Sequence, residues 1–84
     1  MRHARPAALD GLEPLLARLR EIGPLKEKGR GVFYLRSRAF LHFHEDPAGL
    51  FADLRDADGD FTRLDITDPT AWDALVEMAR ARSV

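Results

Sequence analysis

Residues 32–55, VFYLRSRAFLHFHEDPAGLFADLR, contain three short runs rich in aromatic and aliphatic residues. Apolar runs of this length, bounded by turn residues, are typical of strands rather than helices. Asp46-Pro47-Ala48-Gly49 has the composition of a type I turn and separates the second run from the third. Arg36-Ser37-Arg38 joins the first two runs with a weaker turn pattern. We therefore predict three consecutive antiparallel strands here.

A fourth strand is predicted at the end of this region, in DFTRLDI at residues 60–66, after a hairpin turn at Asp58-Gly59.

The acidic turn DADGD, residues 56–60, has some likeness to a calcium loop. An EF-hand loop needs glycine at its sixth position and glutamate at its twelfth, whereas here the glycine is fourth and Thr67 is twelfth. We expect an acidic hairpin tip, and four strands within residues 32–66.

Helices are predicted on either side of the strands. Leucines at helical spacing in LEPLLARLREIG predict a helix over 11–23, capped by Asp10 with Glu13 and ended by Gly23-Pro24. Residues 1–10 are expected to form a loose arm, and the charged LKEKGRG after the helix a loop. Asp68 as N-cap and Pro69 at the first position predict a second helix over 69–82.

The expected fold is one small α+β domain, residues 1–84, with a two-layer α-β-β-β-β-α order and a four-stranded antiparallel meander. Alternation along the strands assigns nine residues to the face under the helices: Phe33, Leu35, Leu41, Phe43, Leu50, Ala52, Leu54, Leu64 and Ile66. The opposite face then carries Tyr34, Phe40, His42, His44, Phe51, Asp53, Phe61 and Arg63. A β-bulge would exchange parts of these sets. Two helices cover only one face, so the second face is predicted to touch a partner.

Composition excludes several classes of protein. The chain has no cysteine, which excludes disulfides, thiolate metal sites and a thiol nucleophile. No apolar run approaches the roughly 20 residues that a membrane span needs, and MRHARPAALDGL lacks the apolar core of a signal peptide. We expect a cytoplasmic protein. The formal net charge of −1 lacks the basic excess typical of nucleic-acid binders.

His42 and His44 form the strongest candidate for metal chemistry. Residues two apart on a strand point the same way, and Asp53 or Glu45 would add a carboxylate, a donor set that suits zinc or iron(II). A metal-dependent enzyme built on this pair is one alternative hypothesis. The third histidine, His3, falls in the loose arm, so our expectation is histidines without a metal, and no cofactor.

Basic residues suggest another alternative, a nucleic-acid-binding module on the first hairpin. Tyr34 and Phe40 would stack on bases while cations contact phosphates. The cations are Lys26, Lys28, Arg30, Arg36 and Arg38. The two serines, Ser37 and Ser83, have no G-x-S-x-G setting, and no nucleotide-binding glycine motif is present. We therefore expect a protein that is not an enzyme.

The hairpin region resembles the strand pair of MmcQ/YjbR-like proteins, a group of small bacterial α+β proteins. The matching pieces are Phe33, Arg36, Arg38, Phe40 and His44-Glu45-Asp46-Pro47, about a quarter of the chain. The chain is shorter than those proteins and lacks their tyrosine- and tryptophan-bearing segment before the last helix. The resemblance implies an α+β fold and adds weight to DNA binding through a winged hairpin, and it brings no catalytic residues.

The leading hypothesis is a non-catalytic interaction or self-association module that uses the second face of its sheet. A homodimer or another protein is the expected partner, with nucleic acid as the alternative and no membrane. The predicted binding residues are Tyr34, Arg36, Arg38, Phe40, His42, His44, Phe51, Phe61 and Arg63.

Overall fold

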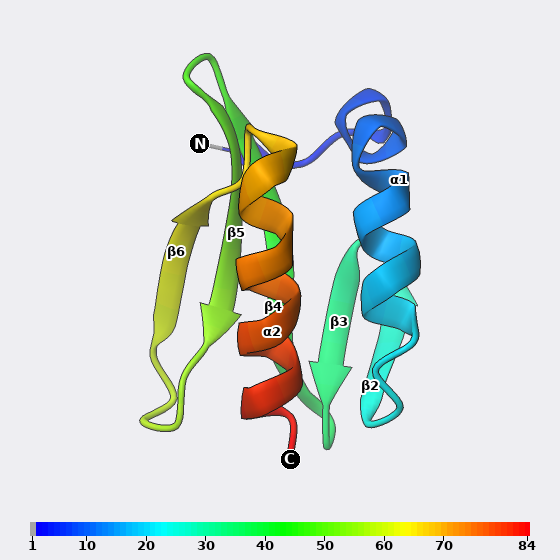
Figure 1. The fold of residues 1–84 in the computed structure, drawn as a ribbon, viewed down its shortest axis with the longest axis vertical. Helices are drawn as coiled ribbons and strands as arrows, with labels where there is room; N and C mark the ends of the chain where they lie inside the picture. The colour runs from blue at the N-terminus through cyan, green and yellow to red at the C-terminus, as the bar shows by residue number, and fades with distance from the viewer. Residues whose placement is uncertain (1) are drawn as a thin grey trace.

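One antiparallel sheet with two helices side by side on one of its faces forms the fold, in a computed structural model that describes residues 2–84 (Figure 1). The strands are β1 (Arg2–His3), β2 (Leu25–Gly29), β3 (Val32–Leu35), β4 (Arg38–Asp46), β5 (Gly49–Arg55) and β6 (Phe61–Asp65). They follow the order β2-β3-β4-β5-β6, and β1 pairs with β4. The helices are α1 (Pro6–Arg20), a 3-10 turn η1 (Pro69–Ala71) and α2 (Trp72–Arg82). The α+β class and the antiparallel sheet are confirmed.

The predicted number of four strands is too low, because two segments expected to be irregular belong to the sheet. LKEKG, predicted as a loop, is β2 and forms a hairpin with β3, in which Lys26 pairs with Tyr34. The arm predicted at residues 1–10 contains β1, which pairs Arg2 with Glu45 and His3 with His44. β1 therefore continues the edge of β4 beyond the end of β3.

Helix α1 begins at Pro6, ahead of the predicted start at residue 11. Proline suits the first position of a helix because its missing N–H would be unpaired there. This earlier start brings Leu9 into the buried stripe, which continues through Leu12, Leu15, Leu16 and Leu19. Asp10 is not the N-cap; it lies inside the helix, and its carboxylate pairs with Arg30 at 2.8 Å.

The core lies between the helices and one face of the sheet. Of the nine residues predicted to face the helices, six are buried, and Leu35, Leu50 and Leu64 pack against the core while half-buried. The helix predicted over 69–82 begins as the 3-10 turn η1, which Asp68 caps by accepting a hydrogen bond from Thr70 N–H at 3.0 Å. The N-cap residue of α2 itself is Ala71, which makes no side-chain cap. Neither helix found in residues 2–84 is long and apolar enough to cross a membrane.

Candidate functional site

The face of the sheet that points away from the helices is the open face. Along β4 and β5, the core residues alternate with residues of the open face, and His42 pairs directly with Asp53, and His44 with Phe51. The next ladder adds Arg63 opposite Asp53 and Phe61 opposite Arg55. The predicted residues His42, His44, Phe51, Asp53, Phe61 and Arg63 thus share one face.

Phe40 is the exception and corrects the prediction. Phe33 pairs with Leu41 and Tyr34 with Ala39, so Phe40 is an extra residue, a β-bulge in β4. Phe40 and Leu41 are consequently both buried in the core, and only 3% of Phe40 is exposed. Phe40 is therefore unable to bind a partner on the open face or to stack on a base.

The three histidines of the chain lie together on the open face. The pairing of β1 with β4 brings His3 beside His44, with their ring centroids 5.8 Å apart and their rings nearly perpendicular. His3 also lies 6.3 Å from His42, whose ring is 4.8 Å from that of His44. The expectation that His3 lies apart in a loose arm is wrong, because the β1 pairing places a third imidazole beside the pair.

Asp53 connects this histidine cluster to Arg63. The guanidinium of Arg63 donates from Nε to Oδ1 at 2.7 Å and from Nη2 to Oδ2 at 2.8 Å. Oδ2 also lies 3.1 Å from His44 Nε2. The hydrogen bonds from Arg63 lower the pKa of Asp53 below its usual range, so the carboxylate is ionised at neutral pH. Partial burial, and then the charge of His44, lowers the pKa of His42, which favours the neutral imidazole.

Phe61 is the large apolar side chain most open to solvent on this face, with 40% of its surface exposed. The His42 ring lies 4.9 Å from it, and the Arg55 guanidinium lies over it at 4.5 Å. Arg55 is itself held by carbonyl oxygens of Ala39 and Gly59. Toward the β2 edge, Lys28 lies over the ring of Tyr34 at 5.0 Å. Aromatic rings and cations therefore alternate on the open face.

Arg36 and Ser37 form the tight turn between β3 and β4. Both have positive φ, 51° and 71°, which is the geometry that a two-residue hairpin turn requires. Arg36 and Arg38 are exposed, and neither forms an ion pair with another described residue. Arg30, predicted to join them against phosphates, instead pairs with Asp10 and Glu13 of α1.

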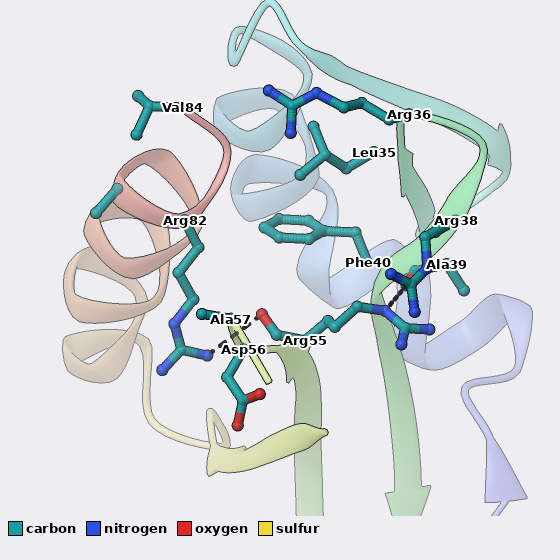
Figure 2. A pocket seen from close by; sticks show the side chains of 11 residues that line it. Leu35, Arg36, Arg38, Ala39, Phe40, Arg55, Asp56, Ala57, Arg82 and Val84 are labelled. Carbon is teal, nitrogen blue, oxygen red and sulfur yellow. Dashed lines mark hydrogen bonds between the residues drawn. The ribbon is translucent and has the colours of Figure 1, made fainter. Parts of the chain in front are cut away.

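A pocket of about 490 Å³ opens beside this turn (Figure 2). Phe40 and Leu35 form an apolar part of its wall, and Arg82 reaches it from the end of α2. Four arginines line the pocket together with one carboxylate; they are Arg36, Arg38, Arg55, Arg82 and Asp56. Arg55 and Arg82 were not predicted as members of this site, because they come from β5 and α2, far in sequence from the basic residues of the first hairpin.

The acidic turn at 56–60 has a structural role in the fold. Oδ1 of Asp56 accepts hydrogen bonds from the backbone N–H groups of Asp58 at 2.9 Å and Asp60 at 3.0 Å. Gly59 has φ of 91°, a conformation that glycine adopts without strain. Because the Asp56 carboxylate is used to close its own turn, the geometry favours the expected hairpin tip over a calcium site.

No family model, curated protein or solved structure matches this chain. The resemblance to MmcQ/YjbR-like proteins stays a prediction. The open face and the arginine-lined pocket are therefore the features from which a function is inferred.

Proposed function

We propose that the protein is a non-catalytic binding module that associates with a second copy of itself through the open face. The observation that carries the proposal is the one-sided cover of the sheet. Both helices pack on one face (Figure 1), and the strand pairing puts Tyr34, Phe51 and Phe61 on the other. Aromatic residues and arginines are the side chains enriched in protein interfaces.

The layout of the open face is compatible with a second copy as the occupant. Lys26 and Tyr34 lie toward the β2 edge of this face, and Arg63 and Asp65 lie on β6 at the other edge. A two-fold axis parallel to the strands sets the β2 edge of one copy against the β6 edge of the other. A chain of 84 residues also gains stability from such pairing, because a small domain buries a small share of its surface alone.

The test is sedimentation of the wild type and two matched variants across a micromolar concentration series. We expect a monomer–dimer equilibrium whose Kd rises at least about tenfold in Phe61→Ser, since aromatic residues dominate interface energies. Val84→Ser is the control, because Val84 is the other exposed large apolar residue among residues 2–84 and lines the arginine pocket instead. A monomer at every concentration, or equal effects of the two variants, contradicts the proposal.

The arginine-lined pocket favours a second candidate function, binding of nucleic-acid phosphates. Arg36 and Arg38 have no acidic partner among the described residues, although the chain as a whole has a net charge of −1. Bases would find little to stack on here, since Phe40 is buried, so interactions with phosphate would supply most of the affinity.

This candidate predicts strongly salt-dependent binding to duplex DNA. The Arg36→Ala/Arg38→Ala variant should reduce the slope of log affinity against log salt by about 2 relative to wild type, because each arginine neutralises one phosphate. Arg80→Ala, an exposed arginine on α2, should leave the slope unchanged. Absence of binding at low ionic strength removes this function, because the attraction between arginine and phosphate is strongest there.

A further inference from the structure

The histidine cluster has an arrangement of hydrogen-bonding groups that protons alone satisfy poorly. His44 Nε2 lies 2.9 Å from His42 Nδ1 and 3.1 Å from Asp53 Oδ2. Each neutral imidazole has one N–H and one lone pair, and an ionised carboxylate only accepts. Both short distances therefore involve the same nitrogen, His44 Nε2, which has either one N–H or one lone pair to offer.

Neither tautomer of His44 makes both approaches favourable. If Nε2 carries the proton and donates it to Asp53, the lone pair of His42 Nδ1 faces a donor already in use. If His42 Nδ1 donates to Nε2 instead, the lone pair of Nε2 is occupied and the carboxylate faces another acceptor. A cation held between the three atoms satisfies all of them at once, because each then directs a lone pair at it.

We propose that His42, His44 and Asp53 bind a zinc-class divalent ion, with His3 as the fourth ligand. The three donors lie within 4.8 Å of one another. Tetrahedral ligands at a zinc–donor distance of about 2.1 Å are about 3.4 Å apart, close to the 2.9 and 3.1 Å measured between these atoms. Imidazole donors with one carboxylate favour zinc and its first-row neighbours over magnesium or calcium, which prefer all-oxygen sites.

Three of the four proposed ligands are held in fixed relative positions by the pairing of β4 with β5. His42 and His44 project from one strand two residues apart, and Asp53 is the direct cross-strand partner of His42. Only 7% of Asp53 is exposed, and the Arg63 fork fixes both of its oxygens. An outer hydrogen bond of this kind orients a ligating carboxylate. The positive charge of Arg63 also repels a cation, which sets an upper limit on the affinity.

His3 completes the set from a separate element. Its ring lies 5.8 Å from that of His44 and 6.3 Å from that of His42. Imidazoles bound to one tetrahedral zinc have centroids about 5 Å apart, so the exposed His3 side chain must move toward the pair to serve as the fourth ligand. All four residues belong to one chain, and the site therefore does not depend on self-association.

The experiment is titration of chelator-treated protein with zinc, at chain concentrations where sedimentation shows a monomer, so that its failure is distinct from failure of the dimer proposal. We expect saturable 1:1 binding and a zinc-dependent rise in melting temperature. His42→Ala, His44→Ala and Asp53→Asn should each weaken binding about 100-fold or more, since outer-sphere changes alone cost about 10–100-fold. His3→Ala should weaken it about tenfold.

Glu77→Gln is the control, since Glu77 is an exposed carboxylate on α2 in the helix layer, away from the open face, and the zinc affinity of this variant should equal that of wild type. Nitrogen-15 spectra of the histidine rings give a readout that needs no variant: zinc should shift Nδ1 of His42 and Nε2 of His44. No saturable zinc binding, binding that survives removal of both His42 and His44, or ring nitrogens unmoved by zinc overturns the site. Unchanged affinity in His3→Ala overturns the role of His3.

Discussion

Gly49 shows how one residue closes the hairpin between β4 and β5. Its φ of 147° lies in the region that L-residues with a side chain rarely adopt. A methyl group at this position would also meet the side chain of Thr67, whose hydroxyl oxygen accepts a hydrogen bond from Leu50 N–H at 2.9 Å. Both the conformation and the close approach therefore require glycine at residue 49.

Gly49→Ala is expected to lower the free energy of unfolding by about 2 kcal/mol, because backbone strain and the clash with Thr67 add together. Gly11→Ala is the matched control. Gly11 lies inside α1 with open space around its Cα, so alanine there should raise stability by about 0.5–1 kcal/mol. Urea denaturation of both variants checks the prediction, and equal effects of the two substitutions would contradict it.

Single residues also show how far alternation predicts the sheet. Alternation assigned His42, His44 and Asp53 to one face correctly, since the β4–β5 register runs without interruption. It failed at Phe40, where one extra residue in β4 turned a predicted partner-binding ring into the core. A bulge moves side chains to the other face with no change in composition, so the pattern of residues does not reveal its place.

Among the elements, α1 is fixed to the β2–β3 hairpin by ion pairs around Glu27. Arg20 donates to both oxygens of Glu27, and Gly31 N–H donates to Oε2 at 2.8 Å. Arg20 also pairs with Glu13 on its own helix, and Glu13 with Arg30 of the hairpin. One carboxylate on β2 thus joins a helix, a strand and a turn.

The hydrogen bond from Arg20 lowers the pKa of Glu27 below its ordinary value of 4.5. Because the pKa is lower in the folded state, the charged carboxylate stabilises the fold at any pH above the ordinary pKa of 4.5. This stabilisation is lost as the pH falls through the lower pKa that Glu27 has in the folded protein. Glu27→Gln should therefore cost about 1 kcal/mol at neutral pH. The difference in the free energy of unfolding between this variant and wild type should shrink as the pH falls below the ordinary pKa of Glu27 and through its folded-state pKa.

Unfolding measured from neutral pH into the acid range tests this pH dependence. Glu21→Gln, on an exposed glutamate outside the ion-pair network, should match wild type throughout. If the difference in the free energy of unfolding between wild type and Glu27→Gln persists unchanged in acid, the loss of stability comes from altered packing of the side chain and not from its charge.

The elements that the sequence analysis missed are those whose identity depends on distant partners. β1 has two residues, and only its pairing with β4, far along the chain, makes it a strand. β2 is charged and contains glycine, properties typical of a loop, yet β3 supplies its hydrogen bonds. The helix ends were better defined where local chemistry decides them, as at Asp68, whose side chain caps its own turn.

At the scale of the whole molecule, the sheet is one layer with helices on one side only (Figure 1). The core uses the aliphatic residues and buried phenylalanines of one face, and the open face keeps the histidine cluster, the Asp53–Arg63 pair and the partly exposed Phe61. Both the proposed self-association and the proposed metal site follow from this one-sided cover. The pocket near the α2 end of the molecule is a separate feature and does not depend on it.

The most direct test of the open face is the accessibility of its aromatic rings to a soluble paramagnetic probe, measured by NMR at low and high protein concentration. The rings of Tyr34, Phe51 and Phe61 should relax strongly in dilute protein and become protected as concentration rises, while Val84 stays accessible at both. Rings equally accessible at every concentration, or protection at Val84 instead, would contradict the account.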